Sequence, residues 1–165
     1  MKSFFVFLIL LFFCSQLQAG EENKNLSFYT GKFDILDDVG DDKTELFGVE
    51  HRNPNLFRNT FVGKLAPISG MFITGKGAAY VYTGVEAQYK IGFLEIAPSF
   101  SPGYYEKGNG KNLGDVLEFK SELKVGLDIF KDSNIGYTYS HISNNDWGSV
   151  NPGSDNQSLM FSKKF

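Results

Sequence analysis

The sequence is poor in the residues that build metal centres and covalent cross-links. Its only cysteine, Cys14, lies in an apolar N-terminal segment, and His51 and His141 are its two histidines. Zinc sites in proteins are built mainly from several Cys and His ligands. The sequence therefore predicts no metal site, and it predicts no disulfide in the remainder of the chain.

Long apolar runs and strong positive charge are also missing. After the N-terminal segment, no apolar stretch approaches the roughly 20 residues that a membrane-spanning helix requires. The formal net charge is −3, and no basic stripe runs along the chain. Nucleic acid is therefore not an expected partner. Anionic lipid is not excluded, because local charge matters more than the sum.

The N-terminus has the organisation of a secretory signal. Lys2 precedes an apolar run over 4–13, and the small residue Ala19 comes just before the charged pair Glu21 and Glu22. A positive start, a short apolar core and a small residue at the cleavage position are typical of signal peptides. We expect a signal peptide over 1–19 and one barrel domain over 20–165.

The segment 116–130 alternates between apolar and charged residues. Odd positions are mostly apolar and even positions mostly charged, with Leu117, Phe119, Leu123, Val125, Leu127 and Ile129 opposed to Glu118, Lys120, Glu122, Lys124 and Asp128. A period of two residues indicates a β-strand with one apolar and one polar face. An α-helix would scatter these charges around its circumference.

Seven further segments repeat this pattern more faintly. The eight predicted strands are 26–36, 44–51, 65–74, 78–89, 92–104, 116–130, 135–143 and 155–165. Short alternating segments rich in aromatic residues and separated by turns are typical of outer-membrane barrels. We predict an all-β protein: an eight-stranded antiparallel transmembrane β-barrel in the bacterial outer membrane, with side chains filling its interior.

Three residues with the chemistry of a hydrolase triad fall on one face of the last two predicted strands. His141 and Ser143 occupy odd positions of 135–143, and Asp155 begins 155–165. Antiparallel neighbours would bring these positions together at the outer rim of the barrel. Ser143 is the candidate nucleophile, His141 the base and Asp155 the acid that orients it. A polar cluster on a lipid-facing surface is costly, which favours a functional role.

The same region resembles a known family. The segment 139–144 (YSHISN), followed by 151–153 (NPG), resembles the lipid A 3-O-deacylases, which are acyloxyacyl hydrolase-like outer-membrane proteins. The segments 112–114 (NLG) and 118–121 (EFKS) are similar to the sixth-strand region of that family. The resemblance covers about the C-terminal third of the chain.

This resemblance implies an esterase that removes the 3-O-linked acyl chain of lipid A, the anchor of lipopolysaccharide, without a metal or other cofactor. The family triad maps onto His141, Ser143 and Asp155, and Asn144 matches the position implicated in the oxyanion hole. The family pattern has Glu where this chain has Asp155. The implied partners are lipopolysaccharide and outer-membrane lipid.

Two alternatives stay open at this point. A non-enzymatic eight-stranded barrel with a structural or adhesion role would use His141 and Ser143 as ordinary residues of the membrane interface. A lipid A acyltransferase barrel would place its catalytic groups in extracellular loops and hold an acyl chain inside. The sequence also leaves open whether the barrel forms a homodimer.

Overall fold

The computed structural model describes residues 25–37 and 42–165, so the signal peptide predicted for 1–19 lies outside the described residues. These residues form ten strands: β1 (Asn25–Phe33), β2 (Thr44–Arg52), β3 (Arg58–Thr60), β4 (Gly63–Thr74), β5 (Ala79–Ala87), β6 (Tyr89–Ile91), β7 (Leu94–Glu106), β8 (Leu117–Phe130), β9 (Ser133–Ser143) and β10 (Ser154–Lys164). No helix capable of crossing a membrane occurs in this part of the chain.

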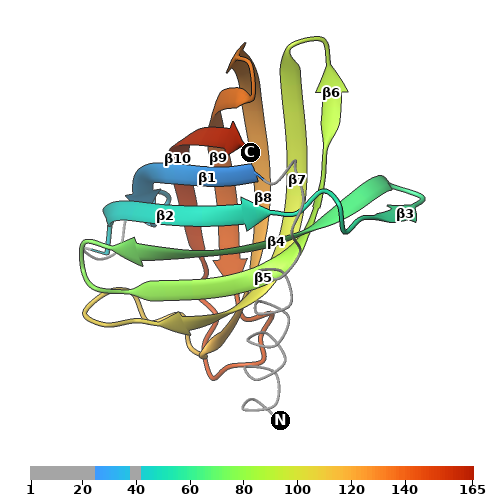
Figure 1. Ribbon diagram of the computed structural model, residues 1–165. Helices are drawn as coiled ribbons and strands as arrows, with labels where there is room; N and C mark the ends of the chain where they lie inside the picture. The colour runs from blue at the N-terminus through green and yellow to red at the C-terminus, as the bar shows by residue number, and fades with distance from the viewer. Residues whose placement is uncertain (1–24, 38–41) are drawn as a thin grey trace.

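Eight of these strands form the wall of a closed antiparallel barrel (Figure 1). β1 pairs with β10 on one side and with β2 on the other, and the pairing of β2 with β4 completes the ring through β5, β7, β8 and β9. β3 and β6 are short additions that pair only with β4 and β7. The predicted eight-stranded barrel is confirmed.

The strand boundaries differ from the predicted ones where the backbone turns. β1 ends at Phe33 rather than at residue 36, because Asp34 has a φ of 62°, outside the extended region. β9 begins at Ser133, two residues early, directly after Asp132 with a φ of 64°. The segment 52–64, predicted to be a plain connection, contains β3.

The connections divide into two ends of the barrel. The long-loop end comprises the connections after β1, β4, β7 and β9, described over 34–37 and 42–43, 75–78, 107–116 and 144–153. The short-turn end comprises 53–62, 88–93 and 131–132. The start of β1 and the end of β10 meet at the short-turn end, where Asn25 pairs with Lys164. Outer-membrane barrels have short periplasmic turns and longer extracellular loops, so the long-loop end is the extracellular one.

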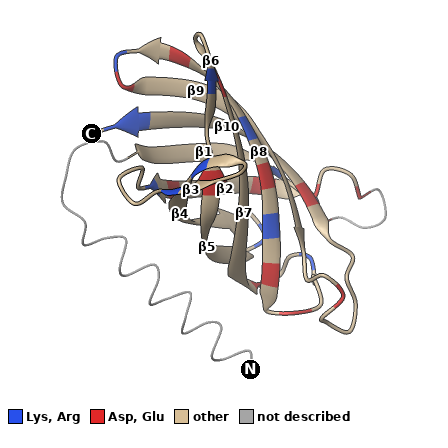
Figure 2. Cartoon of the chain, turned by 90° about the vertical axis from the view of Figure 1, so that its right-hand side faces the viewer, with Lys and Arg blue, Asp and Glu red and all other residues tan. Residues whose placement is uncertain are grey.

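The two faces of the wall carry opposite kinds of residue. Along β8, Leu123, Val125 and Leu127 are exposed on the outside, while Lys120 and Lys124 are buried inside. Figure 2 shows charged residues of alternating sign along this strand. An apolar exterior around a polar interior is the arrangement that suits a lipid-facing barrel wall, and it confirms the alternation read from 116–130.

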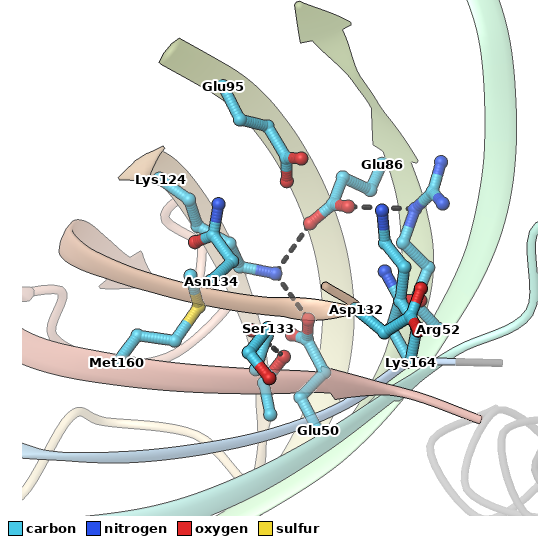
Figure 3. Close-up of a pocket in the computed structure, with 13 residues that line it drawn as sticks. Glu50, Arg52, Glu86, Glu95, Lys124, Asp132, Ser133, Asn134, Met160 and Lys164 are labelled. Carbon is cyan, nitrogen blue, oxygen red and sulfur yellow. Dashed lines mark hydrogen bonds and ion pairs between the residues drawn. The ribbon is translucent and has the colours of Figure 1, made fainter. Parts of the chain in front are cut away.

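Side chains fill the interior in two layers. Toward the long-loop end, the core is largely aromatic and includes Phe33, Phe72, Tyr80, Tyr82, Tyr105, Leu113 and Ile142. Toward the short-turn end, the interior is charged (Figure 3): Lys124 Nζ contacts both Glu50 and Glu86, and Arg52 Nε lies 2.8 Å from Glu86 Oε1. Paired charges can be buried where unpaired ones could not.

An ion-pair cluster fastens the extracellular loops to the top of the barrel. Lys111 Nζ lies 2.7 Å from Asp34 Oδ1 and 2.9 Å from Asp37 Oδ2, and the Tyr105 hydroxyl donates to the Lys111 carbonyl. Burial alone would lower the pKa of Lys111, but the hydrogen bonds to the two aspartates raise it above its usual value. The loop 107–116 is thereby held against the end of β1, close to the rim where the last two strands meet.

Candidate active site

The register of β9 and β10 brings the predicted acid and base together. Asp155 is directly opposite His141, and Gln157 is directly opposite Tyr139. Both pairs lie on the outer face, because the neighbouring residues Ile142 and Asn156 point into the barrel and are buried. Ile142, which lies between His141 and Ser143 in β9, packs into the largely aromatic core. This packing fixes the end of β9.

His141 and Asp155 are in direct contact. His141 Nδ1 lies 3.1 Å from Asp155 Oδ1, and the two side chains are 48% and 24% exposed. A proton on Nδ1 would be donated to this carboxylate, which leaves Nε2 as the basic nitrogen. The shorter aspartate reaches the imidazole because the two residues form a cross-strand pair.

Gly153 defines the orientation of the imidazole ring. A Cβ added at Gly153 would lie 2.9 Å from His141 Cε1 and 3.2 Å from Nε2, so this edge of the ring packs over the glycine. Gly153 precedes Ser154, which pairs with Ile142, and it is therefore level with Ser143 across the ladder. The basic edge of His141 therefore lies beside Gly153, at the level of the candidate nucleophile in the ladder.

Ser143 is the last residue of β9 and shares the outer face of His141. It pairs with Phe119 of β8 and is half-buried. Phe119 stacks on Phe100 with ring centroids 6.0 Å apart, and it makes a T-shaped contact with Trp147 with ring centroids 5.2 Å apart. An aromatic surface thus borders Ser143 on the β8 side. No local pattern in the sequence points to Phe100 or Trp147, because only the strand register places these rings beside the serine.

Asn144 occupies a buried position that fastens two extracellular loops together. Its Nδ2 donates to the carbonyls of Leu113 at 2.7 Å and Val150 at 2.8 Å, and its backbone N–H donates to Asn151 Oδ1 at 3.0 Å. Both amide hydrogens therefore have acceptors in this conformation. The residue holds the loops on either side of the Ser143 end of β9.

Tyr139 is a further polar contact of the site that the sequence analysis did not identify. Its hydroxyl donates to Asp155 Oδ1 over 2.8 Å, from two residues below His141 on the same strand. Among the described residues, no group of three or more His, Cys, Asp or Glu side chains lies together as a metal site would require. The candidate site brings the imidazole of His141 and the carboxylate of Asp155 together on the outer face, with the hydroxyl of Ser143 two residues along β9.

Comparison with known proteins identifies the family. The sequence model of the lipid A 3-O-deacylases (PagL) matches residues 59–164. No curated protein matches the sequence.

Solved structures share the fold at low sequence identity. The crystal structure of the outer membrane enzyme PagL superposes with a TM-score of 0.66 at 16% identity, over 86% of this chain and 99% of that chain. A de novo designed transmembrane β-barrel gives 0.59 at 10% identity, over 89% and 98% of the two chains. Neisserial surface protein A gives 0.55 at 10% identity, over 86% and 97%. The family match covers more than half of the sequence, and the chain belongs to the PagL family of outer-membrane lipid A 3-O-deacylases.

Proposed function

We propose that this chain hydrolyses the ester at the 3-position of lipid A with Ser143 as nucleophile, His141 as general base and Asp155 as the orienting acid. The observation that carries the proposal is the contact of 3.1 Å between His141 Nδ1 and Asp155 Oδ1 on the outer face, two residues from Ser143 on the same strand. A wall with only a structural role has no need for this contact on a lipid-facing surface.

The reaction would proceed by acyl transfer in two stages. Ser143 Oγ attacks the ester carbonyl carbon while His141 Nε2 takes the hydroxyl proton, and the resulting imidazolium is stabilised by Asp155. The bond between the acyl carbon and the sugar oxygen then breaks, and His141 gives its proton to that oxygen, which leaves as the sugar hydroxyl. Water repeats the sequence on the acyl-enzyme, which releases the fatty acid and restores Ser143.

The location of the site suits this substrate. Lipid A occupies the outer leaflet, and the groups lie on the exterior of the barrel at its extracellular rim. The rings of Phe100, Phe119 and Trp147 provide an apolar surface on the β8 side of Ser143, along which we place the acyl chain. All of these groups come from one chain, so the proposed site does not depend on a homodimer.

Asn144 is our candidate for stabilising the oxyanion. To donate there, its amide would have to exchange one of its two carbonyl acceptors for the developing negative charge. A donor in this role contributes about 10²–10³ in rate.

Mass spectrometry of lipid A from cells that express the wild type or Ser143→Ala tests the proposal. We expect the wild type to remove one ester-linked hydroxyacyl mass and Ser143→Ala to lower deacylation on the order of 10³-fold or more. Unchanged lipid A in both strains, with both barrels shown to be folded in the outer membrane, would overturn the reaction. Equal deacylation by both proteins would overturn the role of Ser143.

A further inference from the structure

Two hydrogen-bond donors meet at one oxygen of the candidate acid. The Tyr139 hydroxyl lies 2.8 Å from Asp155 Oδ1, and His141 Nδ1 lies 3.1 Å from the same atom. Tyr139 is not opposite Asp155 in the ladder but one rung lower, opposite Gln157. Its long side chain therefore crosses the ladder diagonally, over a separation that aromatic side chains can span.

The environment of Asp155 makes a second donor valuable. Its carboxylate lies on the outer face of a membrane barrel, where charged groups with few hydrogen bonds are costly. A carboxylate held only by His141 could still rotate about its own χ angles. Both donors come from β9: the phenol fixes the position of Oδ1 from one rung below, while the imidazole approaches from directly opposite.

We propose that Tyr139 is a positioning residue for the triad, which holds Asp155 Oδ1 where it orients His141. The inference rests on the proposed function, since it assigns Tyr139 a role through Asp155. In this role Tyr139 acts on the nucleophile only through Asp155 and His141. Its hydroxyl keeps its proton throughout and donates to the carboxylate at every stage of the reaction.

The barrel contains a matched control one rung below. The Tyr137 hydroxyl donates to Gln157 Oε1 over 2.6 Å, with the same diagonal relation between β9 and β10. Tyr137 and Tyr139 have similar exposed fractions, 43% and 39%. Loss of either hydroxyl removes one tyrosine-to-β10 hydrogen bond from the same surface, but only Tyr139 is bonded to the candidate acid.

The test compares Tyr139→Phe with Tyr137→Phe, using purified protein and lipid A in mixed micelles. Hydrogen bonds to charged groups are strong enough that we expect Tyr139→Phe to lower kcat about tenfold, with KM changed less than about twofold. Tyr137→Phe should leave both constants at the wild-type level. Heat-modifiable mobility on gels checks that each barrel is folded.

A double mutant separates positioning from general packing. If Tyr139 acts through the carboxylate, Tyr139→Phe should lower kcat no further in an Asp155→Ala background. Wild-type kcat in Tyr139→Phe, or an equal decrease in both backgrounds, would overturn the inference. If Ser143→Ala were inactive in the same assay, the proposed function would stand even though the role of Tyr139 had failed. An active Ser143→Ala would overturn both the proposed function and the role of Tyr139.

Discussion

The imidazole of His141 can pack against the backbone of residue 153 because that residue has no side chain. Gly153 also has a φ of 63°, which L side chains rarely adopt. We expect Gly153→Ala to displace the imidazole and to lower turnover about 10²-fold, since misplacement of a catalytic group by about 1 Å can have that effect. Turnover of lipid A by the purified variant is the measurement.

Gly92→Ala is the control for this substitution. Gly92 has a φ of 64°, and a Cβ there would meet nothing within 4 Å. Both variants should lose about 1–2 kcal/mol of stability from the left-handed backbone, while only Gly153→Ala should lose activity. Equal activity of the two variants would mean that the packing of Gly153 against His141 is unimportant.

The arrangement of the candidate site could be predicted from the sequence only in part. The alternation on 135–143 and 155–165 placed His141, Ser143 and Asp155 on one face, because strand periodicity is a local property of the sequence. The bond from Tyr139 to Asp155 Oδ1 depends on the register of two strands and on a diagonal side-chain direction. The carbonyl of Leu113, which anchors Asn144, lies 31 residues away along the chain, and no local pattern reveals it.

At the scale of elements, β8 was the most predictable strand and β3 and β6 were the least. β8 has 14 residues with charges on one face, so its period of two is unmistakable. β3 and β6 have three residues each, and all six side chains are exposed. β3 has no apolar residue, and three residues are too few for the alternation in either segment to stand out. They become strands only because β4 and β7 extend beyond the wall and offer a partner.

The interior charges of β8 connect it to β2 and β5. Lys124 contacts Glu50 and Glu86, and the three side chains are 9%, 3% and 4% exposed. Lys124→Met would leave the two carboxylates without this cation in a buried setting. We expect the variant to lose about 3–5 kcal/mol of stability, measured by urea unfolding of the barrel in detergent micelles.

Lys32→Met provides the comparison at the surface. Lys32 Nζ lies 2.7 Å from Glu45 Oε1, but these side chains are 56% and 57% exposed. The protein does not enclose these two groups, so loss of Lys32 leaves no carboxylate buried without its cation, and this variant should unfold at nearly the same urea concentration as the wild type. A similar loss in both variants would show that the interior network contributes no more than an ordinary surface pair.

At the scale of the whole molecule, the apolar exterior continues past the barrel wall onto the hairpins of the short-turn end. The β3–β4 hairpin projects away from the wall (Figure 1) and exposes Phe57, Phe61 and Val62 to 43%, 102% and 42%. The neighbouring β6–β7 turn exposes Phe93 to 73%, and the Tyr89 hydroxyl donates to the Val62 carbonyl. Aromatic residues favour the membrane–water interface, so we expect both hairpins to lie against the periplasmic leaflet.

Fluorescence of a tryptophan at position 61 tests this placement. Trp147 is the only tryptophan, so Phe61→Trp is made in a Trp147→Phe background. Contact with lipid should shift the emission to the blue and allow quenching by brominated phospholipid, while Asn109→Trp in an exposed extracellular loop should emit as in water. Emission from position 61 that is red-shifted and quenched by acrylamide instead would place the hairpin in the periplasm. The apolar surface would then end at the barrel wall. The exposed Phe61 side chain would in that case need a binding partner in the aqueous periplasm to cover it.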